Sequence, residues 1–366
     1  MRFYVPSNIY VEKNCVKNHK EEFPKIGKKA LIVTGRHSAK VNGSLDDVLS
    51  VLEEKEIPYV IFDQVEENPS LETVEKGALL GKDSGADFLI GIGGGSPIDA
   101  AKAMAILMAN PEEPAADLYV NKGLSHLPVV AIPTTCGTGT EATAVSVLTN
   151  HQKGMKKSIP YKIFPSLSLV DGKYLAAARK SLIISTSIDA LAHAVESYLN
   201  SKSDIYNRMF PEYAFRLWAQ NKEALASDAA LTEDQCELFM LTSTIAGMAI
   251  AHTGTGIPHG MSYDLTYHKN VPHGMACGYF LAAYMEVCAK YVPDQVKNVL
   301  TMLDFADLEE FRTYLTSLIG SFEISREEKE SFAQAMAYNE GKLSAAPCKV
   351  TPEDIHFIYE KSLIIK

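Results

Sequence analysis

The chain has 366 residues and a formal net charge of −10 at pH 7. That length is enough for two domains with well-buried cores. The acidic balance argues against a nucleic acid or an anionic membrane as partner, because both bind basic protein surfaces. No apolar run is long enough to cross a bilayer, and residues 1–6 lack the apolar core of a signal peptide.

The six cysteines are scattered along the chain and include no C-x-x-C pair. We interpret them as reduced thiols, which predicts a cytoplasmic protein. They are Cys15, Cys136, Cys236, Cys277, Cys288 and Cys348.

The first half of the chain alternates strand-like and helix-like segments. Strands are predicted at 29–34, 58–62, 87–92 and 127–132. A helix is predicted to begin near residue 45, and an alanine-rich helix is predicted to end near residue 108. This alternation indicates βαβ units and a mostly parallel sheet.

The pattern changes after about residue 178, where few strand candidates remain. Helices are predicted near 182–200, 206–226, 232–251, 275–292, 295–317, 326–340 and 352–365. We therefore expect an α/β domain over residues 1–178 and an all-helical domain over residues 179–366, and motifs within them predict dinucleotide binding by the first and metal binding by the second.

A glycine-rich turn, Gly-Gly-Gly-Ser-Pro at 93–97, joins a buried strand to a helix. Glycines such as Gly94 and Gly95 let a backbone approach a ligand closely. Ser96 suits the N-cap and Pro97 the first helical position, so the free amides predict a phosphate site. A tight turn without a ligand is the alternative, since the run is not the G-x-G-x-x-G fingerprint.

A second loop, residues 133–143, follows another buried strand and contains five threonines and two glycines. Ligands of open α/β sheets bind beyond the carboxyl ends of the strands, so this loop is a candidate polar cradle. A hydroxyl-rich surface loop is the alternative.

The residues after the first predicted strand bear on the choice of dinucleotide. An acidic residue there would bind the ribose 2′-hydroxyl of NAD. The run at 35–40 is Gly-Arg-His-Ser-Ala-Lys, which has cations and a hydroxyl but no carboxylate. It favours the 2′-phosphate of NADP(H), with Gly35 and Ser38 as candidate contacts. A solvated basic loop is the alternative.

Four residues could form a metal site. Asp189 and His193 are one helical turn apart, on one face if the segment is helical. His259 and His273 each stand in a Pro-His-Gly setting, fourteen residues apart. Three imidazoles and one carboxylate suit a divalent ion such as Fe²⁺ or Zn²⁺. Four unrelated polar residues are the alternative.

These motifs resemble the iron-containing (group III) alcohol dehydrogenase family, which shares its fold with dehydroquinate synthase and glycerol dehydrogenase. The resemblance spans nearly the whole chain, and the motifs occur in the family's order. They are Asn-Pro at 68–69, Gly-Gly-Gly-Ser-Pro-Ile-Asp-Ala-Ala-Lys at 93–102, Pro-Thr-Thr-Cys-Gly-Thr-Gly-Thr-Glu at 133–141, Asp-Ala-Leu-Ala-His-Ala-Val-Glu at 189–196, His259, and Pro-His-Gly at 272–274.

The resemblance implies a set of site residues and a homodimer. It gives Asp189, His193, His259 and His273 as the ligands of Fe²⁺, with Zn²⁺ as the alternative metal. It also supports NADP(H) over NAD(H), because relatives with a glycine-serine loop after the first strand tend to use NADP. The cofactor contacts that it implies are Asn68, Gly94, Gly95, Ser96, Asp99, Thr134, Thr135, Thr138, Ser146, Lys157 and Leu182.

The expected reaction is hydride transfer between NADP(H) and a small primary alcohol or aldehyde, with the substrate oxygen bound to the metal. A glycerol or diol dehydrogenase, and a metal- and NAD-dependent lyase of the dehydroquinate synthase type, are the alternatives. A third alternative is a nucleotide-binding protein without enzymatic activity, which the complete set of four candidate ligands disfavours. Many relatives have a histidine four residues after the third ligand that is suspected of proton relay. Tyr263 stands there in this chain, and its phenol could still relay a proton.

Overall fold

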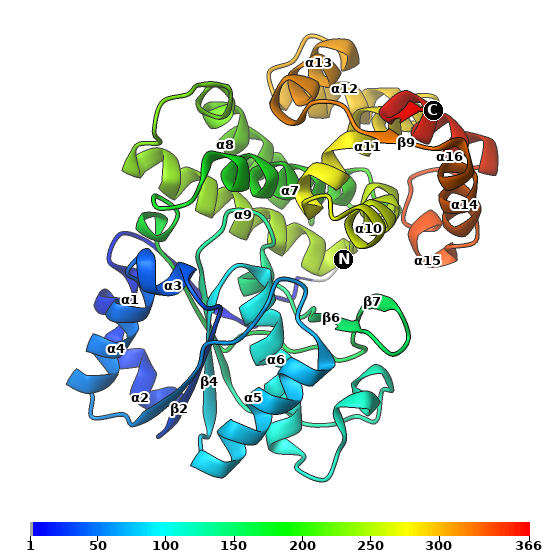
Figure 1. Ribbon diagram of the computed structural model, residues 1–366. Helices are drawn as coiled ribbons and strands as arrows, with labels where there is room; N and C mark the ends of the chain where they lie inside the picture. The colour runs from blue at the N-terminus through cyan, green and yellow to red at the C-terminus, as the bar shows by residue number, and fades with distance from the viewer. Residues whose placement is uncertain (1–2) are drawn as a thin grey trace. The chain divides into compact units, whose positions relative to one another are not determined.

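A six-stranded parallel sheet organises the first half of the chain in the computed structural model, which describes residues 3–366 (Figure 1). The strand order is β1-β8-β5-β4-β2-β3, and every neighbouring pair is parallel. The strands are β1 (Asn8–Val11), β2 (Ala30–Thr34), β3 (Tyr59–Phe62), β4 (Phe88–Gly93), β5 (Val129–Pro133) and β8 (Leu167–Val170).

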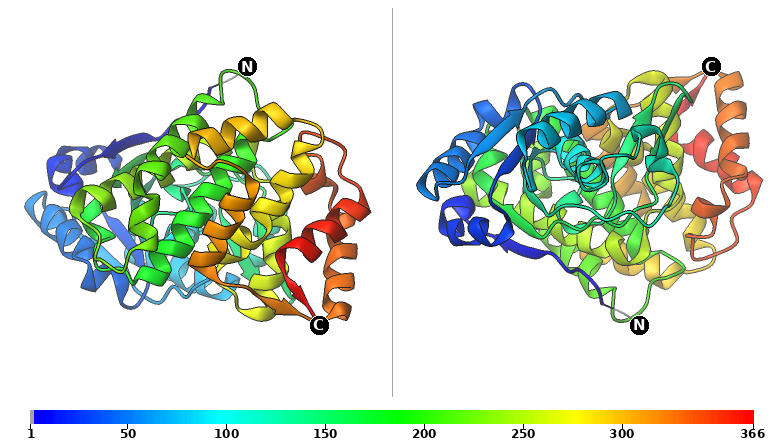
Figure 2. Two further views of the ribbon diagram at one scale, coloured as in Figure 1. Left: turned by 90° about the horizontal axis from the view of Figure 1, so that it is seen from above. Right: turned by 90° about the horizontal axis from the view of Figure 1, so that it is seen from below.

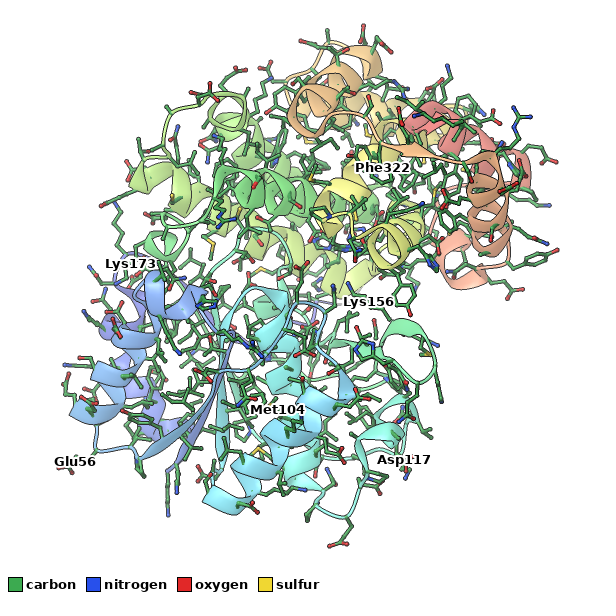
Figure 3. All side chains as sticks on the ribbon, in the orientation of Figure 1. Glu56, Met104, Asp117, Lys156, Lys173 and Phe322 are labelled. Atoms are coloured by element: carbon green, nitrogen blue, oxygen red, sulfur yellow. The ribbon has the colours of Figure 1, made fainter. Side chains whose placement is uncertain are left out.

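Helices cover both faces of this sheet, because successive side chains of β2 alternate between two core clusters. Leu31 and Val33 belong to one core cluster with α5 and α6, whereas Ala30 and Ile32 belong to another with α4. Met104 of α6 lies inside the first cluster (Figure 3). The helices are α1 (Cys15–Asn18), α2 (Phe23–Ile26), α3 (Ser38–Val41), α4 (Ser44–Glu54), α5 (Leu71–Ser84) and α6 (Gly95–Ala109). A strand buried on both faces must be apolar throughout, which explains the continuous apolar runs in the sequence.

The predicted α/β class is confirmed, and the four predicted strands match β2, β3, β4 and β5 within two residues. The pattern did not indicate β1 or β8, which are four-residue strands at one side of the sheet. It also did not indicate the antiparallel hairpin of β6 (Val147–Asn150) and β7 (Met155–Ser158).

The second half of the chain is helical. In Figure 2, α7 (green) and α11 (yellow) lie side by side, and they pack against each other closely. The helices are α7 (Lys180–Tyr198), α8 (Met209–Ala226), α9 (Glu233–Thr253), α10 (Ile257–Lys269), α11 (His273–Ala289), α12 (Pro293–Met302), α13 (Leu308–Ile319), α14 (Arg326–Ala337), α15 (Glu340–Leu343) and α16 (Pro352–Ser362).

The chain divides into two compact units. The α/β unit comprises residues 5–178 and 231–244, and the helical unit comprises residues 3–4, 179–230 and 245–366. Helix α9 therefore begins in the α/β unit and ends in the helical unit. The assignment of dinucleotide binding to residues 1–178 and of metal binding to residues 179–366 stays a prediction.

Two features of the helical half differ from the predicted helices. The single helix expected at 295–317 is interrupted, because Asp304 has a φ of 58° and Asp307 caps the start of α13. Helix α10 was not among the predicted helices, and it ends at Lys269, before Asn270 in the left-handed conformation. The predicted all-helical content also needs a small correction, since β9 (Glu323–Ile324) and β10 (Ile364–Ile365) form a short parallel pair.

Within residues 3–366, we find no helix with the length and apolar character that a membrane crossing requires.

Candidate functional site

The four predicted metal ligands come together in the helical unit. Asp189 and His193 lie on successive turns of α7, His259 in the first turn of α10, and His273 at the start of α11. The Oδ1 atom of Asp189 is 3.8 Å from Nε2 of His193, 3.3 Å from Nε2 of His259 and 3.7 Å from Nε2 of His273. Two ligand atoms about 2.1 Å from a tetrahedral metal are about 3.4 Å apart. These spacings fit a shared divalent ion.

The burial of these groups points the same way. Asp189 is 3% exposed and His259 is 3% exposed. Within the described chain, Asp189 Oδ1 and His259 Nε2 are buried and have no hydrogen-bond partner. A buried polar atom without a partner is costly, so each requires an explanation. Burial alone would raise the pKa of Asp189, but the imidazoles of His193, His273 and His259 hold it well below its ordinary value.

Gly274 allows α11 to begin beside α7. A Cβ atom at this position would lie 1.8 Å from the carbonyl oxygen of Ser185 and 3.0 Å from Cβ of Asp189. No side chain fits into that space. The glycine of the Pro-His-Gly motif therefore brings His273 within reach of Asp189.

Glu196 holds His259, the third predicted ligand, in position. Its Oε1 accepts from the backbone N–H of His259 at 2.8 Å, and its Oε2 accepts from the N–H of Gly256 at 2.9 Å. The same Oε2 is 2.8 Å from Nδ1 of His259. Burial would raise the pKa of this carboxyl group, but His259 lowers it overall. A carboxylate on Nδ1 leaves Nε2 facing Asp189, which is how ligating histidines are commonly oriented.

We expect Glu196→Gln to weaken metal binding about 10–100-fold, the usual effect of losing a carboxylate behind a ligating histidine. The single amide oxygen can still accept one of the two backbone N–H groups, and the side chain keeps its size, so the fold should be retained. Competition with a metal chelator measures the affinity, and the thermal unfolding midpoint monitors the fold. Unchanged affinity in a folded variant would contradict the positioning role.

The glycine-rich turn and the threonine-rich loop contact each other in the α/β unit. A Cβ atom on Gly94 would lie 3.1 Å from Thr135 Oγ1, and one on Gly95 would lie 2.9 Å from Thr138 Cγ2. The N–H of Thr134 donates to the carbonyl of Gly93. Within the described chain, no side chain caps the first turn of α6. The uncapped amides leave a possible anion site, as helix N-termini do.

Ser96 does not have the capping role that the sequence suggested. The helix begins at Gly95 and its N-cap is Gly94, so Ser96 lies inside the first turn. Its hydroxyl instead accepts from the backbone N–H of Asn68 at 3.1 Å. The turn is therefore shorter than the three glycines suggested, because Gly95 is already the first residue of the helix.

Asp99 and Lys102 join α6 to the threonine-rich loop. The hydroxyl of Thr140 donates to Oδ1 of Asp99 at 2.6 Å, and the N–H of Val147 donates to Oδ2 at 2.9 Å. Ser146 donates to the carbonyl of Asp99 at 2.8 Å. Lys102 is fully buried and donates to Thr140 and to the carbonyls that follow it. Asp99 therefore orients the loop, and its own oxygens are already occupied.

The hairpin places Lys156 next to Asn68, and the cofactor contact expected of Lys157 stays a prediction. Lys156, which Figure 3 labels, donates from Nζ to Oδ1 of Asn68 at 2.6 Å. Lys157, the predicted contact, is exposed on β7. Adjacent residues of a strand point to opposite faces, so a choice between two consecutive lysines cannot be made from sequence spacing.

The remaining predicted cofactor residues are less enclosed. Ser38 is exposed at the start of α3, and Gly35 precedes it. Lys40 pairs with Asp63 at 2.6 Å, so a carboxylate from the end of β3 does reach this loop, which the run at 35–40 could not show. Leu182 is 44% exposed near the start of α7 in the helical unit.

Tyr263 lies one turn after His259 on α10. Its ring stacks on the ring of His273, with centroids 6.0 Å apart and an interplanar angle of 12°. The ammonium of Lys342 lies 5.5 Å above the same ring and donates to Thr255 Oγ1. The predicted position next to the metal ligands is thus observed, whereas the proton relay stays a prediction.

Comparison with known families covers almost the whole chain. Residues 6–172 match the profile described as iron-containing alcohol dehydrogenase. Residues 183–363 match the profile for the C-terminal part of the same family. The chain belongs to the iron-containing alcohol dehydrogenase family. It is therefore an oxidoreductase of the alcohol dehydrogenase type, and the resemblance expected from the motifs is confirmed.

Individual members of the family are similar over most of their length. An NADPH-dependent butanol dehydrogenase of Clostridium saccharobutylicum is 32% identical, with 84% of this chain and 79% of that protein covered. A lactaldehyde reductase of Escherichia coli is 30% identical, with 90% and 91% covered. The crystal structure of an iron-containing alcohol dehydrogenase from Thermotoga maritima has a TM-score of 0.91, 36% identity and 99% coverage of both chains.

Proposed function

We propose that the protein transfers hydride between NADP(H) and a small primary alcohol or aldehyde, with a divalent metal held by Asp189, His193, His259 and His273. The observation that carries the proposal is the buried Oδ1 of Asp189, which lies within 3.8 Å of three imidazole nitrogens and has no hydrogen-bond partner in the described chain. Membership of the family supports the same reaction type.

The donor set fits Fe²⁺, with Zn²⁺ as the alternative metal. Three imidazoles and one carboxylate are ligands that both ions accept. When bound, the metal supplies a Lewis acid that polarises the oxygen of the alcohol or aldehyde. The protein's part is to hold the donors: Glu196 orients His259, and Gly274 brings His273 close to Asp189.

The α/β unit is proposed to bind the dinucleotide. The amides of Gly95 and Ser96 at the uncapped start of α6 would bind the pyrophosphate. Thr135 and Thr138 line the adjoining loop, and Asp99 fixes that loop through Thr140. The nicotinamide itself carries the hydride. Tyr263, stacked on His273, is the candidate for moving the hydroxyl proton of the substrate.

The preference for NADP(H) rests on the loop after β2. Gly35 has no side chain that could bind a ribose 2′-hydroxyl, and Arg36 is exposed next to it. A guanidinium suits a phosphate in a bidentate geometry. An NADPH-dependent relative at 32% identity supports this reading.

Arg36→Ala is expected to lower the ratio of kcat/KM for NADPH over NADH about 10-fold, because a hydrogen bond to a charged group contributes about 1.5 kcal/mol or more. Lys28→Ala is the matched control, since Lys28 is an exposed cation that precedes β2, whereas Arg36 follows that strand. Steady-state kinetics with both cofactors give the ratio. An unchanged ratio in the Arg36 variant would overturn the assignment of this residue.

The substrate class is tested with purified protein that has been stripped of metal and reloaded separately with Fe²⁺ and Zn²⁺. NADPH oxidation is followed with butanal, lactaldehyde and 3-hydroxypropanal. The last two aldehydes test a second candidate function, the interconversion of hydroxyaldehydes and diols. The similarity to a lactaldehyde reductase and to a 1,3-propanediol dehydrogenase of Klebsiella pneumoniae favours this candidate. Absence of net cofactor turnover with every aldehyde would contradict the proposal.

We also propose that the protein is a homodimer and that it is located in the cytoplasm.

A further inference from the structure

A thiol lies within the candidate metal site. Cys277 is on α11, one turn after His273, and is fully buried. The donor atoms of Asp189, His259, His273 and Cys277 all lie within 4.8 Å of one another. The Sγ atom is 3.9 Å from Nε2 of His273. Zinc–sulfur bonds are about 2.3 Å and zinc–nitrogen bonds about 2.1 Å, so two such ligands are about 3.1–3.8 Å apart at the 90–120° angles of a five-coordinate ion. The thiol therefore needs only a small shift to coordinate the same ion.

We propose that Cys277 is a metal ligand in this protein and adds a thiolate to the carboxylate and imidazoles. On metal binding, the S–H bond breaks, the sulfur–metal bond forms, and the proton leaves to solvent. The inference rests on the proposed function, because it requires the metal site formed around Asp189.

The position of Cys277 explains how it can coordinate without closing the site. The side chain of His273 is 28% exposed, whereas Cys277 is one turn further along the same helix and fully buried. The sulfur thus belongs to the buried side of the ligand group, and the exposed side is left for substrate. A soft sulfur donor also changes the metal preference, since thiolates favour Zn²⁺ and other thiophilic ions.

Cobalt(II) gives a direct test, because a thiolate bound to it produces an intense charge-transfer absorption in the near ultraviolet. The metal-free full-length protein is loaded with one equivalent of Co²⁺, and bound metal is measured by elemental analysis. We expect the band in the wild-type protein and in Cys348→Ser, a control that removes a partly exposed thiol from the same unit. We expect Cys277→Ser and Cys277→Ala to bind cobalt and lose the band.

Each outcome has a separate meaning. Cobalt bound by the wild-type protein without the band, or a band that persists in Cys277→Ala, would refute the ligand assignment and leave the proposed function standing. A wild-type protein that binds no cobalt would refute both. Circular dichroism identifies a variant that has failed to fold, and the isosteric serine variant then decides the result.

Discussion

Replacing Asp189 by alanine is expected to abolish metal retention and turnover together. Its Oδ1 atom is the common neighbour of the imidazoles of His193, His259 and His273. Without the carboxylate, the imidazoles and the proposed Cys277 thiolate would have to hold the dication without the one donor that lies within 3.8 Å of all three imidazoles. A metal acting as a Lewis acid contributes several kcal/mol to the transition state, so kcat/KM should fall about 10³-fold or more.

The measurement pairs elemental analysis with NADPH oxidation on the same protein sample. His268→Ala is a suitable control, because His268 is also on α10 but stacks on Phe332, apart from the ligand group. The control should retain metal and activity. Full turnover by metal-free Asp189→Ala protein would show that the site around Asp189 has no part in the reaction.

The sequence predicted the fold class well because the signals are local. Buried parallel strands are apolar throughout, and the runs at β2, β4 and β5 have that character. The strand β8 was missed because its four residues form a strand by pairing with β1 and β5, and much of that pairing is with residues distant in sequence. The break between α12 and α13 depends on one residue, Asp304, whose positive φ no hydrophobic period reveals.

The proximity of the four candidate metal ligands, whose role as ligands stays a prediction, could be predicted because their chemistry is rare and their motifs distinctive. Their surroundings could not, since they arise from packing between segments far apart in sequence. Glu196 was quoted only as the last residue of the motif at 189–196, and its contact with His259 spans sixty-three residues. Cys277 was interpreted as an ordinary reduced thiol, because its proximity to Asp189 exists only once α11 packs on α7. Lys102 was quoted in a motif, but its role as a buried donor needed the structure.

At the candidate metal site, Gly274 of α11 lies against the backbone of α7 with no room for a side chain. An added methyl group would collide with the Ser185 carbonyl oxygen, which belongs to the backbone of α7 and cannot rotate away. Relief requires α11 to move, and the start of α11 is where His273 is attached. Packing strain and ligand geometry are therefore coupled at this one residue.

Gly274→Ala should accordingly lose both stability and metal. Overpacking of this kind costs about 3 kcal/mol, which outweighs the gain of about 1 kcal/mol in helix propensity from glycine to alanine. Gly278→Ala, on the same helix, is the matched control, because the nearest neighbours of its added methyl are side-chain atoms of Ile188 and Ile319 and not a backbone carbonyl. Chemical denaturation gives the two free energies of unfolding, and elemental analysis gives the metal content. We expect Gly278→Ala to keep its metal, and equal metal content and stability in both variants would contradict the coupling between α7 packing and His273.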